Sequence, residues 1–173
     1  AYMSRLLDML KDGKIDLMLG SSSDFRQKEC RFLRFFREEV VLAISEKHPL
    51  AAKAGRPQDL RPVLEDLREV EDVPFVISGQ GSAIRRISDS VFEAHGISPT
   101  VIFETDNIPL RSGMISSNQC IGFLPATYVY RDTSLRCFSM SPKVYIYSGM
   151  YHLNEKSLNQ YERHLIYLAY QYS

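Results

Sequence analysis

Three short runs of small polar residues follow apolar segments of the chain, and they hold side chains well suited to binding a small ligand. They are Ser21, Ser22 and Ser23, then Gln80, Gly81 and Ser82, then Thr105, Asp106 and Asn107. Hydroxyl and amide groups can donate to a ligand, and free N–H groups at a helix start favour an anion. Serine is also a common local cap, and Asn107 could merely cap its own helix. We expect a ligand site where the runs meet, with Thr105 and Asn107 as its members from the third run.

Groups that could support catalysis or bind a metal are scattered. His95, His152 and His164 show no spacing to a nucleophile or a metal partner, and the three cysteines form no CxxC pair. The sequence contains no G-x-S-x-G or H-E-x-x-H motif, no phosphate-binding glycine loop and no evident acid–base pair. We therefore expect no enzyme activity, no metal and no cofactor. A redox role for Cys120 with Cys137 stays open as an alternative, although reactive thiols need an accessible, electropositive setting.

The bulk composition is that of a soluble globular domain, with 173 residues, 45% of them hydrophobic and 24% charged. The 21 basic and 21 acidic residues cancel, so no general field attracts nucleic acid or an anionic membrane. No apolar run approaches the roughly 20 residues of a membrane span, and the start of the sequence lacks a signal-peptide core. We expect a cytoplasmic protein that contacts no membrane and does not bind DNA through this segment.

Short apolar runs bounded by glycine, proline or charged residues predict the strands that position these loops. The runs cover 15–19, 32–36, 40–44, 74–78, 100–103, 121–124, 135–140 and 143–147. The second and third strands are predicted as separate, because the charged residues 37–39 lie between them. The segment 48–72 is rich in charge, proline and glycine and is interpreted as a linker, with a possible short helix at 63–70.

Helical spacing of apolar residues predicts helices at 3–10, 82–95, 108–117 and 154–170. Ser82 is the expected N-cap of the second helix, with Gly96 after its end, and Asn154 is the expected N-cap of the last. Arg85 and Arg86 could reach an acidic ligand or lie in solvent. The last helix carries an apolar stripe that is expected to pack on a sheet or to join a partner. The stripe consists of Leu158, Tyr161, Leu165, Leu168 and Tyr172.

Three stretches of the chain, in order, resemble the effector-binding domain of LysR-type transcription regulators. The first, 6–10 followed by 12–19, is similar to the family's helix, glycine and G-x-(I/L)-D-(L/V) strand. The second, 40–44 followed by 48–51, is similar to its crossover strand and hPLA segment. The third, 114–125, is similar to its L-V-x-x-G-x-G-I-x-x-L-P run. Together the three stretches and the elements between them cover most of the chain.

The chain departs from that pattern in three places. Asn118 and Cys120 stand where the family usually has glycine. Asparagine tolerates a left-handed backbone, whereas Cys120 needs an ordinary backbone or some strain. The connection 49–74 is longer than usual. The family's first strand, helix and second strand have no counterpart upstream of Ala1, so the first subdomain is expected to lack one wall of the cleft. We therefore expect the chain to keep the family's fold better than it keeps effector binding.

The resemblance implies an α/β fold like that of periplasmic binding proteins, with two subdomains of mainly parallel sheets joined by two crossover strands. Helices alternating with short strands favour the same class. The first subdomain is expected to combine 1–44 with 143–173 and the second to cover 74–137, while 45–73 and 138–142 are connections. Ligands of open α/β sheets bind beyond the carboxyl ends of strands. We therefore expect the three polar runs to border the cleft between the subdomains.

The resemblance also implies the ligand-sensing domain of a bacterial DNA-binding transcription regulator. A small-molecule effector that prefers the closed arrangement of the lobes shifts the population toward it. Such domains form homo-oligomers, as dimers or tetramers, and DNA is contacted only through a winged helix-turn-helix part absent from this sequence. The serine-rich loops favour a small carboxylate or another anion as effector. A solute-binding protein of a transport system shares this architecture and is the alternative.

Overall fold

The computed structural model describes residues 2–23, 29–55 and 62–172. Its elements, in chain order, are α1 (Tyr2–Lys11), β1 (Met18–Ser22), β2 (Cys30–Ser45), the 3-10 helix η1 (Pro49–Ala52), β3 (Val63–Leu64), the 3-10 helix η2 (Leu67–Val70), β4 (Phe75–Ile77), α2 (Ala83–His95), β5 (Val101–Glu104), α3 (Ile108–Ser116), β6 (Gly122–Pro125), α4 (Ala126–Tyr130), β7 (Leu135–Met140), β8 (Val144–Leu153) and α5 (Gln160–Gln171). This mixture of helices and strands confirms the predicted α/β class.

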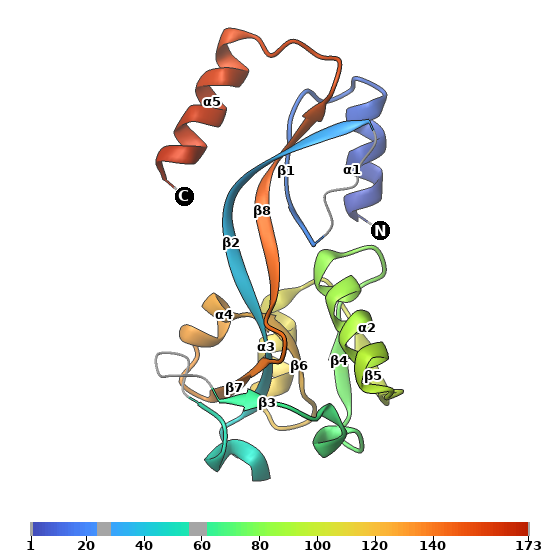
Figure 1. Ribbon diagram of the computed structural model, residues 1–173, viewed down its shortest axis with the longest axis vertical. Coiled ribbons are helices and arrows are strands. Elements are labelled where there is room, and N and C mark those ends of the chain that lie inside the picture. Colours follow the sequence, from blue (N-terminus) through green and yellow to red (C-terminus); the bar gives the residue numbers. More distant parts are fainter. Residues whose placement is uncertain (1, 24–28, 56–61, 173) are drawn as a thin grey trace.

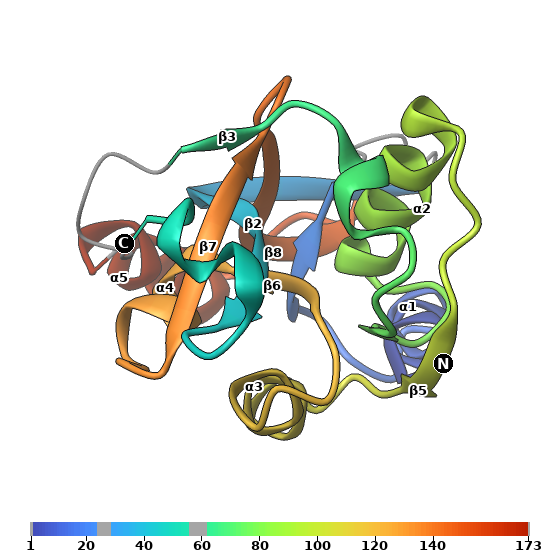
Figure 2. The same cartoon turned by 90° about the horizontal axis from the view of Figure 1, so that it is seen from below.

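The molecule is elongated, and the two long strands β2 and β8 connect its two ends (Figure 1). At the upper end of that view, α1, β1 and α5 lie around the outer halves of β2 and β8. The other helices and strands gather at the lower end. Seen from below, α2, α3 and α4 are placed around the strands of the lower end (Figure 2). β2 and β8 thus occupy the place of the two expected crossover strands.

β2 is one continuous strand of 16 residues, so the prediction of two separate strands is wrong. The charged residues in its middle do not interrupt it, because they find partners on neighbouring strands. The guanidinium of Arg37 lies over the ring of Tyr145 in β8, 4.9 Å from its centroid. The buried carboxylate of Glu39 accepts a hydrogen bond of 2.6 Å from the hydroxyl of Ser139 in β7. Cross-strand contacts therefore stabilise a strand that its local sequence seemed to break.

Most strand pairs are antiparallel, so the expectation of mainly parallel sheets is wrong. β8 pairs antiparallel with β1 and with β2, and β2 pairs antiparallel with β6 and β7. Parallel pairing is found between β4 and β5 and between β3 and β7. The cause is the path of the chain, since β2 descends from the upper to the lower end while β8 returns (Figure 1). Two neighbouring strands that run in opposite chain directions must pair antiparallel.

The segment 48–72, where the structure describes it, belongs to the packed lower end. The predicted helix at 63–70 is wrong, because the chain forms the two-residue strand β3 followed by η2. Leu64, Leu67 and Val70 are buried in the same core as α2 and β4. The backbone N–H of Ser139 in β7 donates a hydrogen bond of 3.0 Å to the carbonyl of Pro62. The segment 48–72 therefore contributes three residues to the core, although its composition is typical of a linker.

The lower half of β2 is buried on both of its faces. Val40, Leu42 and Ile44 face a core shared with α2, while Val41 and Ala43 face a second core shared with α3 and α4. This alternation follows from the two-residue period of a strand. A third, smaller core packs α1 against β1 and β8 at the upper end. Each end of the molecule therefore has apolar packing of its own, and β2 and β8 join them.

Helix ends agree with several local predictions. The hydroxyl of Ser82 accepts a hydrogen bond of 3.1 Å from the N–H of Arg85, which confirms Ser82 as the N-cap of α2. Gly96 ends that helix in the left-handed region with φ 65°. Asn118 adopts φ 61°, as the glycine position requires, and Cys120 is absent from the positive-φ residues of the described ranges. No helix in those ranges is long and apolar enough to cross a membrane.

The last helix differs from its prediction in both start and orientation. α5 begins at Gln160, because Asn159 caps it and Glu162 completes a capping box, so Asn154 is not the N-cap. The expected packing stripe is wrong as well: Tyr161 is 76% exposed and Leu165 is 51% exposed, whereas Ile166 is buried. The face of α5 that packs carries Glu162 and Ile166, which lie four residues apart and therefore share one side of the helix.

Candidate functional site

A cleft of about 440 Å³ lies between the upper and lower ends, beside β2 and β8. The upper end contributes Met3, Gly20 and Ser21, the long strands contribute Glu38, Ile146 and Ser148, and the lower end contributes Ser78, Ser82, Ala83, Ile84, Asp106, Ile108, Arg111, Pro125 and Tyr128. Apolar walls with a small number of converging polar groups are usual for small-molecule sites. The cleft is therefore the candidate binding site.

The upper wall is formed where β1 pairs with β8. The hydroxyl oxygens of Ser21 and Ser148 lie 3.3 Å apart, so the two side chains share a hydrogen bond at the cleft surface. A Cβ on Gly20 would lie 2.8 Å from the Cε of Met3, which shows how closely α1 covers this strand. Ser22 is buried, because neighbouring residues of a strand face opposite sides. Of the first polar run, Ser21 is the residue that lines the cleft.

The N-terminus of α2 forms part of the lower wall. Ser82, Ala83 and Ile84 line the cleft there. The first N–H groups of a helix have no carbonyl partner within it, and the helix dipole makes this end partly positive. Ser82 has already used its side-chain oxygen to accept from the N–H of Arg85. This wall therefore presents backbone donors rather than acceptors.

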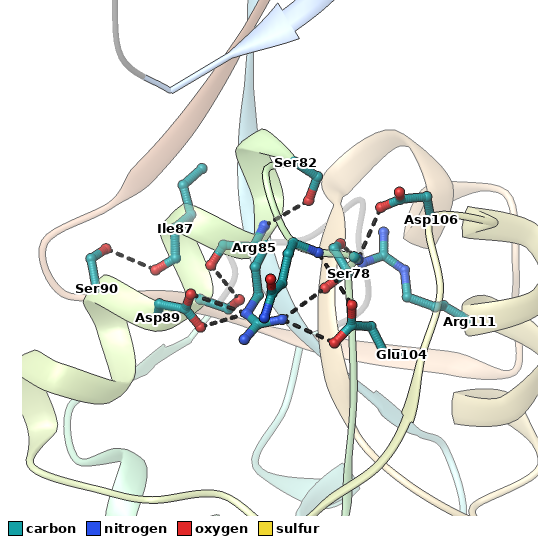
Figure 3. A network of polar contacts seen from close by, with 12 residues as sticks. Ser78, Ser82, Arg85, Ile87, Asp89, Ser90, Glu104, Asp106 and Arg111 are labelled. Atoms are coloured by element: carbon teal, nitrogen blue, oxygen red, sulfur yellow. Dashed lines mark hydrogen bonds and ion pairs between the residues drawn. The ribbon is translucent and has the colours of Figure 1, made fainter. Parts of the chain in front are cut away.

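Arg111 is a buried charged group on the lower wall, with 1% of its surface exposed. Its Nη1 donates a hydrogen bond to the hydroxyl of Ser78, directly after β4, and Figure 3 shows the guanidinium pointing from α3 toward that serine. Its Nε is buried and has no hydrogen-bond partner in the described part of the chain. Burial lowers the pKa of Arg111 to about 10, while the nearby carboxylate of Asp106 opposes that shift. The guanidinium thus remains charged at neutral pH.

Two carboxylates also line the cleft, and both accept hydrogen bonds from the backbone. Asp106 accepts from the N–H of Gly79 at 2.9 Å and so holds the loop before α2. Glu38 accepts from the N–H of Thr127 at 2.8 Å, in the first turn of α4. Anionic groups at helix N-termini and loop N–H groups are stabilising. Both carboxylates therefore already have hydrogen-bond partners within the protein and need no ligand to satisfy them.

Arg85 and Arg86, which could reach an acidic ligand or lie in solvent, are not among the residues that line the cleft. Arg85 forms ion pairs with Asp89 at 2.8 Å and with Glu104 at 3.1 Å (Figure 3). Arg86 reaches the upper end instead: its Nε donates to the hydroxyl of Ser23 at 3.2 Å. Its Nη1 donates to the carbonyl of Gly81 at 2.8 Å. Arg86 therefore joins the two ends of the molecule at the rim of the cleft.

The eight predicted site residues divide into three groups. Ser21 and Ser82 line the cleft, Gln80 and Thr105 line an adjoining hollow, and the other four lie around them. Those four are Ser22, Ser23, Gly81 and Asn107. Ser23 and Gly81 are held by Arg86 at the rim, and Asn107 caps α3 through a bond of 3.0 Å to the N–H of Leu110. Ligand contact by any of them stays a prediction.

Sequence reasoning missed Arg111, although one signal pointed to it. Arg111 is the sole charged residue in α3, whose other residues are apolar, small or proline. A lone charge in such a helix is a candidate for burial or for a site. The buried residues of α3 are Arg111 and Ile115, so the pattern could indicate the residue but not that it is buried.

The histidines and cysteines form no site in the described ranges. No group of three or more His, Cys, Asp or Glu side chains there is placed to hold a metal. Cys30, Cys120 and Cys137 are buried free thiols. Burial raises the pKa of Cys120 to about 11, which suppresses the reactive thiolate at neutral pH. The redox alternative therefore has no support in this setting.

Comparison with known proteins links the chain to one family. The model of the LysR substrate binding domain matches residues 1–171. A curated relative, an uncharacterized HTH-type transcriptional regulator, YybE, of Bacillus subtilis (strain 168), is 27% identical over 120 residues. These residues make up 69% of this chain and 38% of the relative, so the chain spans less than half of that protein.

Solved structures of regulatory domains share the fold. The effector binding domain of QuiR in complex with shikimate superposes with a TM-score of 0.77 at 20% identity, over 97% of this chain and 76% of that one. The Synechocystis PCC6803 CcmR regulatory domain in complex with 2-PG superposes with a TM-score of 0.79 at 16% identity, over 97% and 78% of the two chains. Identities this low show a common fold, which is the expected fold of periplasmic binding proteins.

Proposed function

We propose that this chain, which belongs to the LysR substrate binding domain family, senses a small molecule that binds in the cleft between its upper and lower ends. The cleft itself is the observation that carries the proposal, because side chains from both ends border it. The two solved relatives named above are regulatory domains in complex with small molecules, shikimate in one and 2-PG in the other. By analogy with these two complexes, the function that we propose for this chain is to bind a small effector in its cleft.

The proposed mechanism is a change in the arrangement of the two ends. A ligand that contacts Ser21 on the upper wall and Ser82 on the lower wall binds the closed arrangement more tightly than an open one. That difference in affinity shifts the population toward closure. We assign the first lobe to 1–44 with 143–173 and the second to 74–137. We add the described part of 45–73 to the second lobe, because Leu64, Leu67 and Val70 pack there.

The biological setting that we propose follows from the family. The chain acts in the cytoplasm as the sensing part of a transcription regulator, forms homo-oligomers, and influences DNA through a winged helix-turn-helix part. It is not an enzyme in this proposal, which the setting of its histidines and thiols supports. The exposed apolar side chains Tyr161 and Leu165 of α5, with Tyr172 just after it, are available for contacts with other subunits.

A thermal-shift screen of small metabolites, combined with a variant that fills the cleft, tests the proposal. Ser148 faces the cleft, so Ser148→Trp is expected to abolish the stabilisation of the chain by compounds that raise its melting temperature. Tyr147→Trp is the matched control, because Tyr147 is the next residue of the same strand and faces the other side. Stabilisation that survives Ser148→Trp, or a complete lack of stabilising compounds, would contradict a sensing cleft.

A further inference from the structure

Among the charged side chains on the cleft wall, Arg111 is the one whose charge the protein leaves incompletely paired. Its hydrogen bond goes to the hydroxyl of Ser78, a neutral acceptor, and its Nε finds no acceptor in the ranges that the structure describes. The carboxylate of Asp106 acts on it through charge, but that carboxylate also accepts from the N–H of Gly79. Asp106 and Glu38 differ in both respects: each accepts a backbone hydrogen bond, and neither is fully buried. The group on this wall that lacks an acceptor is therefore the guanidinium of Arg111, and an anionic acceptor would also pair its charge.

Physical chemistry makes this arrangement costly unless a ligand completes it. Burying an ion removes its hydration, and a single neutral hydrogen bond does not replace that hydration. A planar guanidinium offers adjacent N–H groups that match the two oxygens of a carboxylate. The N-terminus of α2, with Ala83 and Ile84 on the same cleft, adds backbone donors that favour an anion. Two independent features of the lower wall thus point to the same chemistry.

The rest of the lining indicates what else the ligand contains. Ile84, Ile108, Pro125 and Ile146 line the cleft, and Tyr128 adds a ring. These side chains favour an apolar body on the molecule that carries the acid. Arg111 compensates one negative charge on the ligand, whereas the carboxylates of Asp106 and Glu38 repel any further one.

We infer that the effector is a small monocarboxylate with an apolar body, and that its carboxylate pairs with the guanidinium of Arg111 beside the N-terminus of α2. This inference rests on the proposed sensing function and narrows the ligand of the same cleft. It gives Arg111, rather than Arg85 or Arg86, the role of recognising the acid. In the free chain the guanidinium keeps its bond to Ser78, and the ligand supplies the missing acceptor.

The test uses carboxylates paired with their own primary amides, beginning with benzoate and benzamide, in calorimetric titrations and thermal-shift measurements. The members of each pair have nearly the same shape but differ in charge. We expect stabilising carboxylates to bind at least about tenfold more tightly than their amides, which is the usual effect of a hydrogen-bonded charge. In Arg111→Met that preference is expected to vanish, and in Arg111→Lys part of it is expected to remain because the charge is kept.

The ligand-free stability of the variants separates recognition from a structural role. Replacing a buried ion pair by apolar side chains of similar volume is often neutral or stabilising, and removing the guanidinium of Arg111 likewise removes the cost of burying its charge. Arg111→Met is therefore expected to melt no earlier than the parent chain, and Arg68→Met, at an exposed arginine paired with Asp66, serves as the control that leaves carboxylate binding unchanged. The inference would be overturned if Arg111→Met melts early while both Arg111→Lys and Arg111→Met, where folded, still bind carboxylates as the parent chain does.

Failure of the inference can be distinguished from failure of the sensing function. If amides and carboxylates bind equally and Ser148→Trp abolishes both, the cleft senses ligands but Arg111 does not select an acid, and the inference is overturned alone. Preference for dianionic phenyl phosphate over benzoate would also overturn it, because the proposal requires a single charge. If no compound of any charge class binds, or if Ser148→Trp leaves binding unchanged, the sensing function itself is contradicted.

Discussion

At the scale of single residues, Gly122 shows how the lack of a Cβ lets β6 approach β4 closely. A Cβ at Gly122 would lie 2.6 Å from the carbonyl oxygen of Val76, a backbone atom that cannot move away cheaply. Gly113 in α3 has open space around its Cβ position and is helical. The same substitution should therefore have opposite effects at these two glycines.

We predict that Gly122→Ala lowers the free energy of unfolding by about 1–3 kcal/mol, the usual cost of overpacking. Gly113→Ala is predicted to leave it unchanged or to raise it by up to about 1 kcal/mol, because alanine is the better helix former. Urea titrations followed by circular dichroism measure both values. Equal effects of the two substitutions would show that the close approach of Gly122 to β4 does not exist in solution.

Arg111 is a second example at the residue scale, because this one side chain determines which charge the cleft is proposed to bind. Ser82 was expected at the cleft from its position at a helix start, and Ser21 from a loop after a strand predicted to end at Leu19. Ser21 instead lies within β1, which covers Met18–Ser22, so the predicted end of that strand is wrong. The burial of Ser22 depends on strand alternation, and the orphaned Nε of Arg111 depends on packing between α3 and β4. Local polar residues are visible in a sequence, whereas the cost of a buried charge appears only when its neighbours are known.

At the scale of elements, α5 offers a direct test of which face is buried. Ile166 is 8% exposed and Leu165 is 51% exposed, although the sequence pattern placed Leu165 in the packing stripe. We predict that Ile166→Ala lowers the free energy of unfolding by about 2 kcal/mol or more, as for other buried aliphatic residues. Leu165→Ala should stay within about 0.5 kcal/mol of the parent chain. The reverse order in urea titrations would restore the sequence-based orientation.

The start of α5 makes a second prediction, about pH. A hydrogen bond from Lys156, then one from the N–H of Asn159, hold the pKa of Glu162 below its ordinary value of 4.5. A lowered pKa in the folded chain means that the stabilisation is complete above pH 4.5 and is lost as the pH falls through the lower folded value. Glu162→Gln should therefore cost stability at pH 7 and lose that difference toward pH 3. A difference independent of pH would contradict the ion pair.

These elements also show what the sequence could and could not predict. α2 was predicted at both ends because its signals, Ser82 and Gly96, act on the adjacent backbone. α5 was misplaced because two asparagines could cap it, and the choice depends on Glu162 and on Lys156, which also pairs with Asp16 from the far end of the chain. The continuity of β2 depends on partners about 100 residues away, such as Ser139 for Glu39. Local signals are readable in advance, and long-range pairing is not.

At the scale of the whole molecule, the contact between Arg86 and Ser23 joins the two ends at the rim of the cleft. Losing it should favour a more open arrangement of the ligand-free chain. Spin labels at Arg5→Cys in α1 and Glu93→Cys in α2 would report this, because both positions are exposed and the native cysteines are buried. We predict a longer mean distance between the labels in Arg86→Ala. Arg85→Ala is the control without a change, since the ion pairs of Arg85 stay within the lower end.

The same pair of labels gives the most direct test of a cleft that senses a ligand by closing. The measurement is the distance distribution between Arg5→Cys and Glu93→Cys by electron double resonance, with and without a carboxylate that stabilises the chain. If the cleft closes on its ligand, the distribution becomes shorter and narrower on binding, and it does not change when Ser148→Trp fills the cleft. A ligand that binds the cleft while the distribution stays the same would contradict sensing by closure.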